Sequence, residues 1–268
     1  MRHRFSILFV SALAGALALT SPFNSAIPQT TRRPSQTIPR TLDGHPDFTG
    51  VWAGPGFTHK VGPNDTDTAA VTLFDPKNFS PFKPGGEALL NQKVTGDIVH
   101  DDPTAYCLPD GHPREVLAPY ATQILQPRGY VVILYEYHHF FRVIPTDGRP
   151  HRNEVDLTYM GDATAKWEGD TLVIDTIGLK EWPLDAFLSG GIVRYHSEAL
   201  HTIERIRYTG PVTADYQITI DDPKIFTAPW SQTFQMRLHP TWQLLEHVCE
   251  ENNRDLPHLR PEPSAEKR

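Results

Sequence analysis

The sequence lacks the short motifs that mark several large enzyme classes. It has no G-x-S-x-G nucleophile elbow, no Walker loop and no dinucleotide-binding glycine fingerprint, which excludes the usual forms of α/β-hydrolases, P-loop proteins and Rossmann dehydrogenases. It also lacks an excess of positive charge, because the formal net charge is −7 and the basic residues are scattered, often beside acidic ones. This balance argues against a nucleic-acid partner.

Long apolar segments are scarce, and the only one lies near the N-terminus. Residues 7–19 are too few to span a bilayer and follow Arg2 and Arg4, which is typical of a secretory signal peptide. We expect a signal peptide over residues 1–26, although Asn24 is a poor match for cleavage after Ala26. The mature protein is predicted to be periplasmic or secreted, with no membrane anchor after cleavage; a retained anchor is the alternative.

Cysteine is equally scarce, with only Cys107 and Cys249 in the chain. In an oxidising compartment an isolated pair predicts a disulfide. The alternative is a nucleophilic thiol, but neither AYCLPDG nor HVCEEN matches a thiol-protease signature. We therefore expect a Cys107–Cys249 disulfide.

The remaining chain reads as a linker (27–41), one β-barrel domain (42–253) and a disordered, charged tail (254–268). Within the domain, runs with strand character flank short turns rich in glycine and proline, which predicts antiparallel hairpins. The pairs are 121–126 with 130–143, 163–167 with 171–176, 199–208 with 214–221, and 232–239 with 242–250.

About eight strands after residue 120, with a first strand at Val51, predict an all-β fold. We expect an antiparallel β-barrel or a strongly curved meander sheet, either of which protects strand edges. Gly50-Val51-Trp52 weakly resembles the first strand of lipocalin-like barrels. Residues 54–119 are rich in Pro, Gly and Asp, and we expect them to form a long irregular N-terminal wrap around the barrel.

The stretch Tyr130 to Val143 places ionisable residues in a strand. The strand period of two predicts that Glu136, His138 and Arg142 share one otherwise apolar face. Such groups need partners or solvent. This pattern favours a polar pocket in a β-sheet protein; a solvated sheet face with an ion pair is the alternative.

Several segments together resemble a large family of secreted, mostly uncharacterised bacterial proteins. The tryptophan-glutamate-glycine-aspartate hairpin is the most specific of them, and the resemblance implies a shared fold and a shared site but no defined reaction. The segments are GDATAKWEGDTLVIDTIG (161–178), TDGRPH (146–151), HSEALHTIERIR (196–207) and TIDDPKIFTAPW (219–230).

Candidate site residues fall into a catalytic and a binding set. Glu136 or His201 is the predicted general base, and Glu204 or Glu136 is the predicted carboxylate partner of the histidine. Arg142 and Arg149 are predicted to hold anionic or hydroxyl groups of a substrate. The other substrate-binding candidates are Tyr135, His138 and His151. A solvated loop explains Arg149 as well, and a tyrosine in a sheet is more often part of the core.

No metal or cofactor is predicted. His196 and His201 are five residues apart, which does not fit a helical zinc site. The leading hypothesis is an enzyme, a hydrolase or lyase that acts on a small polar or carbohydrate-like molecule by general acid/base chemistry. The alternatives are a non-catalytic, lipocalin-like small-molecule binding protein of the cell envelope and a scaffold without a ligand. The oligomeric state is not readable from the sequence.

Overall fold

The computed structural model describes residues 37–55, 57–58, 68–69, 73–185 and 191–251. The predicted signal peptide, residues 27–36 of the predicted linker and the predicted tail lie outside these residues. The predicted domain bounds stay a prediction.

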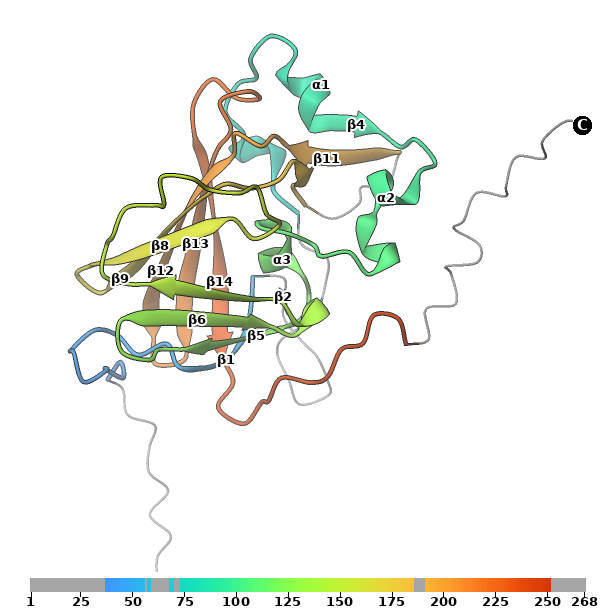
Figure 1. Cartoon of the computed structure of the whole chain (residues 1–268). Helices are drawn as coiled ribbons and strands as arrows, with labels where there is room; N and C mark the ends of the chain where they lie inside the picture. The colour runs from blue at the N-terminus through green and yellow to red at the C-terminus, as the bar shows by residue number, and fades with distance from the viewer. Residues whose placement is uncertain (1–36, 56, 59–67, 70–72, 186–190, 252–268) are drawn as a thin grey trace, which may run out of the picture. The chain divides into compact units, whose positions relative to one another are not determined.

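Nine strands form one antiparallel sheet that curls into a nearly closed barrel (Figure 1). Every neighbouring pair is antiparallel, in the order β7-β6-β5-β1-β14-β13-β12-β9-β8. The strands are β1 (Gly50–Ala53), β5 (Ala121–Leu125), β6 (Tyr130–Tyr135), β7 (Phe141–Pro145), β8 (Asp162–Glu168), β9 (Thr171–Ile177), β12 (His201–Gly210), β13 (Thr213–Asp221) and β14 (Trp230–Leu238). The predicted fold class is confirmed.

Side chains along the barrel strands alternate between the interior and the outer face, as the pleat of a β-strand requires. In β12, Thr202, Glu204 and Ile206 are buried in the barrel, whereas the residues between them are partly exposed on the outer face. The turn between β8 and β9 is tight because Gly169 adopts a φ of 60°, a conformation that glycine accepts without strain. The predicted hairpin around the WEGD segment is therefore present.

The described residues of the predicted irregular wrap form only short elements, and some of their apolar side chains pack against the barrel. Phe74 and Leu90 are fully buried in the shared core. The elements of the wrap are β2 (Phe57–Thr58), β3 (Thr68–Ala69), η1 (Pro76–Asn78), α1 (Gly86–Leu90), β4 (Asn91–Lys93), α2 (Ile98–Asp101), η2 (Pro103–Tyr106) and α3 (Arg114–Leu117).

A small second sheet lies beside α1 at the top of Figure 1. In it β11 (Ile192–His196) pairs with β4 on one side and with β10 (Trp182–Pro183) on the other. The wrap is thus tied to a segment that precedes β12, so that residues far apart in the sequence cover the same end of the barrel.

The predicted disulfide is present. Cys107 at the end of η2 is bonded to Cys249, with 5.5 Å between the two Cα atoms. The predicted strand over 242–250 is wrong, because this segment has no ladder partner. Its backbone binds side chains instead: the Leu245 amide donates to Glu136 and the His247 amide donates to His139.

The predicted single strand Tyr130–Val143 is also wrong. The strand β6 stops at Tyr135, and the chain reverses through η3 (Tyr137–His139) so that Phe141 pairs back with Leu134. The reversal needs a φ of 55° at both His138 and His139, which residues other than glycine seldom adopt. Consequently Glu136, His138 and Arg142 do not share a strand face.

Candidate functional site

Arg142 points into the barrel, where it forms a buried ion pair with Glu204. Its two terminal nitrogens donate to the Glu204 carboxylate at 3.0 and 2.7 Å, and one of them also donates to Thr176 at 2.7 Å. The Tyr216 hydroxyl donates to the same carboxylate at 2.6 Å. Burial favours the neutral acid, but Arg142 outweighs it and holds the pKa of Glu204 below its usual range.

His112 and Tyr135 complete this interior cluster, which we define as Tyr135, Arg142, Thr176, Glu204 and Tyr216 with His112. The ring of His112 is fully buried; its Nε2 lies 2.8 Å from the Thr202 hydroxyl and 3.8 Å from Glu204. Burial lowers the pKa of His112 to about 3, although Glu204 opposes this shift. Because its members are buried among core side chains, the interior cluster is built as a structural network.

A pH dependence of stability follows from His112. Its folded-state pKa lies below the unfolded-state value of about 6.5, so the unfolded chain binds more protons and stability is lost as pH falls from about 6.5 towards 3. We expect the unfolding free energy of His112→Gln to fall less than that of wild type between pH 7 and pH 4.5, measured by urea denaturation. Parallel pH profiles for the two proteins would contradict this.

Further buried ionisable groups lie on and beside α3, and the sequence analysis missed them. Arg114 lies 2.9 Å from Asp110 and 3.0 Å from Asp102. Burial raises the pKa of Asp110 to about 6 and that of Glu115 well above its usual value. The segment DGHPRE, five polar or glycine residues with one proline, carried no periodic signal that marked it as buried.

Glu136 and His138 lie at a second location, the turn η3. Glu136 accepts a hydrogen bond from the Leu245 amide at 2.9 Å. The His138 ring packs on Tyr137 and meets His247 edge-on. Burial, followed by the nearby His247, lowers the pKa of His138 to about 4. These predicted site residues therefore anchor the C-terminal segment to the barrel.

Of the remaining predicted residues, Arg149 and His151 line a groove on the outer face of β8, β9 and β12, and His201 reaches the same face through Asp175. There the ladder places Thr164, Asp175 and Ile203 side by side, with Lys166, Val173 and Arg205 in the next row. The segment 148–151 lies over this face and encloses a groove of about 330 Å³. We call it the histidine groove; it is lined by Gly148, Arg149, Pro150, His151, Thr164, Ala165, Lys166, Glu168, Val173, Asp175, Ile203 and Arg205.

One carboxylate oxygen in the histidine groove meets two imidazoles. Oδ1 of Asp175 lies 2.9 Å from His151 Nε2 and 2.8 Å from His201 Nε2. The other nitrogen of His151 faces Asp162 at 3.1 Å. The hydrogen bond to Asp175 raises the pKa of His201, partial burial opposes it, and the pKa of Asp175 is lowered in return.

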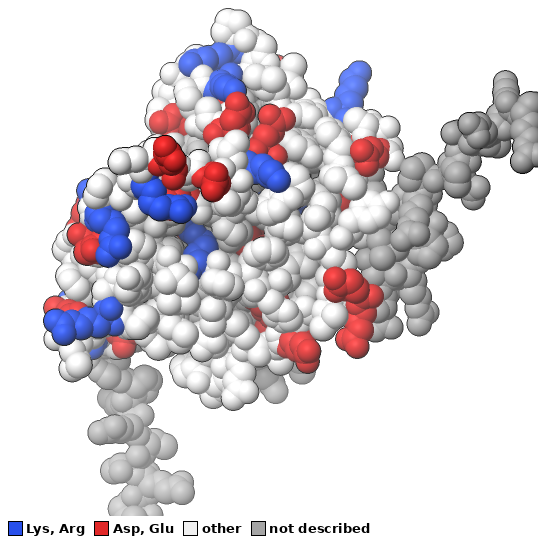
Figure 2. All heavy atoms as spheres, viewed as in Figure 1, with Lys and Arg blue, Asp and Glu red and all other residues white. Residues whose placement is uncertain are grey.

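Three cationic side chains line the same groove. Each has an anionic neighbour: Arg149 pairs with Asp147 at 2.7 Å, and Lys166 and Arg205 share Glu168. On the face shown in Figure 2, red and blue side chains likewise lie next to one another and neither sign covers the surface alone. The groove thus offers polar contacts of both signs rather than a field of one sign.

The predicted pairing of His201 with Glu204 or Glu136 is wrong. Residues three apart on a strand face opposite sides, so His201 lies outside the barrel and Glu204 inside it. The carboxylate that His201 uses is Asp175, which the sequence analysis missed. Asp175 could have been found from the sequence, because it is the one acidic residue in the otherwise largely apolar strand TLVIDTI.

Among the described residues, no group of three or more His, Cys, Asp or Glu side chains is arranged to hold a metal ion. No described helix has the length and apolar character needed to cross a membrane. Comparison with protein-family models, curated proteins and solved structures gave no match. The resemblance to a family of secreted bacterial proteins therefore stays a prediction.

Proposed function

We propose that the protein is a periplasmic or secreted bacterial enzyme, a hydrolase or lyase that acts on a small polar or carbohydrate-like molecule. The observation that carries the proposal is the contact of His151 and His201 with one oxygen of Asp175, a carboxylate that lines the histidine groove. A general base held by a carboxylate beside substrate-binding space is the usual arrangement for acid/base catalysis. The disulfide is consistent with an oxidising compartment.

His201 is the proposed general base. Its Nε2 faces Asp175, which selects the tautomer with a proton on Nε2 and leaves Nδ1 able to accept a proton. The side chain is 33% exposed, so solvent and a small substrate can approach it. Below its raised pKa the same ring carries two protons and becomes a general acid.

His151 is a positioning residue in this proposal. Both of its ring nitrogens face carboxylates, Asp162 and Asp175, so it has no free nitrogen for the substrate. It holds Asp175 in the orientation that His201 requires. Arg149 lines the groove and, although it is paired with Asp147, its guanidinium is about half exposed and can bind a hydroxyl or carboxylate of the substrate.

The proposal predicts a large kinetic effect at His201. The change His201→Gln keeps an amide donor near Asp175 but removes the proton acceptor, and we expect kcat to fall by about 10²–10⁴-fold. Wild-type activity should rise with pH through the raised pKa of His201, above about 6.5. The assay is a screen of p-nitrophenyl glycosides and esters, with ultraviolet detection of unsaturated products for lyase activity.

The matched control is His239→Gln, which changes a half-buried histidine that does not line the groove. It should keep the wild-type rate. An active His201→Gln enzyme with an unchanged pH profile contradicts the proposed base. Asp175→Asn should lower both the rate and the pH at which activity rises, because the group that raises the pKa of His201 is then lost.

The lipocalin-like alternative needs a cavity within the barrel. The interior is instead occupied by large buried side chains, among them Trp52, Ile174 and Tyr216, and by the interior cluster. This packing favours chemistry on the outer face over carriage of a ligand inside the barrel. A carrier would bind a ligand equally well in wild type and in His201→Gln without converting it.

A further inference from the structure

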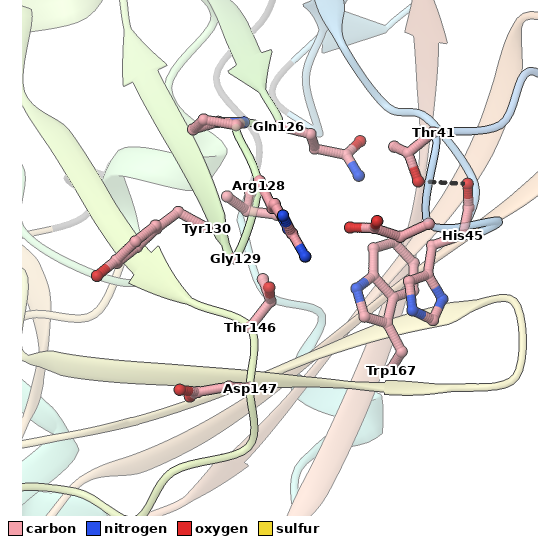
Figure 3. A pocket seen from close by; sticks show the side chains of 12 residues that line it. Thr41, His45, Gln126, Arg128, Gly129, Tyr130, Thr146, Asp147 and Trp167 are labelled. Carbon is pink, nitrogen blue, oxygen red and sulfur yellow. Dashed lines mark hydrogen bonds between the residues drawn. The ribbon is translucent and has the colours of Figure 1, made fainter.

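A second hollow lies at the end of the barrel where the tip of the β8–β9 hairpin meets the N-terminal segment (Figure 3). It has a volume of about 260 Å³ and shares no lining residue with the histidine groove. Four separate parts of the chain form its walls: residues 41–45, the β5–β6 turn at 126–131, residues 146–147 after β7, and Trp167 of β8.

The walls are held in place by hydrogen bonds before any ligand arrives. Arg40 donates to both carboxylate oxygens of Asp170, at 2.9 and 2.8 Å, and so fixes the N-terminal segment to the hairpin tip. Gln126 donates to the Pro46 carbonyl at 3.1 Å. The Thr146 amide donates to the Gly129 carbonyl at 3.0 Å. A pocket with preformed walls loses little entropy on binding.

One wall is aromatic. The rings of His45 and Trp167 are parallel, with centroids 4.6 Å apart and an interplanar angle of 6°. Opposite them, the Arg128 guanidinium points across the hollow toward Trp167 and His45 (Figure 3). Asp43 also lines the hollow. Among the described residues, neither Arg128 nor Asp43 has a partner for a hydrogen bond or an ion pair.

The hollow therefore presents one unpaired cation, one unpaired anion and the Thr146 hydroxyl around an aromatic wall. A ligand of single charge would satisfy Arg128 or Asp43 and be repelled by the other. A pyranose ring has no net charge, its hydroxyls both donate and accept hydrogen bonds, and its C–H face packs on aromatic rings. The volume lies just under the roughly 300 Å³ at which pockets for drug-sized ligands begin, which suits one sugar ring.

We infer that this hollow is a binding site for a neutral saccharide unit, separate from the histidine groove and independent of the function proposed there. Arg128 and Thr146 donate to ring hydroxyls, and Asp43 accepts from them. The outward face of the His45–Trp167 stack contacts the apolar face of the sugar. A zwitterionic amino acid such as glycine or serine also matches the two charges, but it has no apolar ring face to pack on the aromatic wall, so it is the competing outcome of the test.

Saturation-transfer NMR on the full-length mature protein tests the inference. The probes are the methyl glycosides of glucose, galactose, mannose and N-acetylglucosamine, with glycine and serine as zwitterionic probes. We expect at least one glycoside to bind through its ring protons. Arg128→Ala should weaken its affinity at least tenfold, with an unchanged melting temperature because this side chain has no partner to lose.

The matched control is Arg237→Ala, an exposed arginine on β14 outside the hollow, which should keep wild-type affinity. Asp43→Asn should also weaken binding. The inference is overturned if no glycoside binds, if Arg128→Ala binds as wild type does, or if the amino acids bind and the glycosides do not. His201→Gln should bind the sugar normally, which separates this site from the proposed catalytic one.

Discussion

Replacing Arg142 by alanine is expected to lower the free energy of unfolding by about 3–5 kcal/mol. The reason is that Glu204, which is fully buried, would lose its bidentate partner and remain as an uncompensated charge. Urea denaturation at pH 7 measures the effect. The sequence pattern alone suggested a substrate-binding role for Arg142, in which case the variant would lose function and keep its stability.

Two controls separate burial from charge. Arg149→Ala breaks an exposed pair, in which the side chains of Arg149 and Asp147 are each 52% exposed, and should leave the free energy of unfolding nearly unchanged. The double variant Arg142→Met/Glu204→Leu removes both charges and should recover most of the lost stability, since apolar replacements of buried ion pairs are often neutral or stabilising. A fully stable Arg142→Ala protein would refute the structural role.

Removal of the disulfide is the second change with a large expected effect. Cys107 and Cys249 are 142 residues apart, so the loop-entropy model gives about 5 kcal/mol as an upper value, and measured losses are typically about 2–4 kcal/mol. We expect Cys107→Ser/Cys249→Ser to unfold at lower urea concentration by a corresponding amount. Differential scanning calorimetry should show a matching drop in melting temperature.

Reduction of the wild-type protein provides the check on this value. A reducing agent should bring wild type to the stability of the double serine variant and should leave that variant unchanged. If wild type and variant unfold at the same urea concentration without reductant, the disulfide contributes nothing to stability.

The barrel was predictable because its signals are local. Turn residues such as Gly169 and Gly129 mark the hairpins, and the alternation in segments like 201–210 marks the strands. The reversal at η3 was not predicted, because His138 and His139 adopt a positive φ that their residue type does not suggest. A side-chain period of two has no meaning across such a turn.

The site was predictable only in part. His151 and His201 do share one carboxylate, and Arg149 lines the groove beside His151, but whether each polar side chain points into or out of the barrel depends on strand register, which could not be predicted for Glu204 or Arg142. Burial of His112 depends on the tertiary fold, since it belongs to a segment with no strand pattern. The residues that hold the two imidazoles together were therefore visible only in three dimensions.

The number of strands in the barrel has a consequence of its own. Eight successive antiparallel pairings among nine strands leave the first and last, β7 and β8, running in the same direction. A barrel with an odd number of strands cannot close with an antiparallel pair, and two parallel neighbouring strands must be joined by a long crossover connection. The chain between them, residues 146–161, is that long connection, and it carries Arg149 and His151. The odd number of strands thus leaves β7 and β8 without a ladder between them, and the segment that connects these two strands brings Arg149 and His151 onto the outer face.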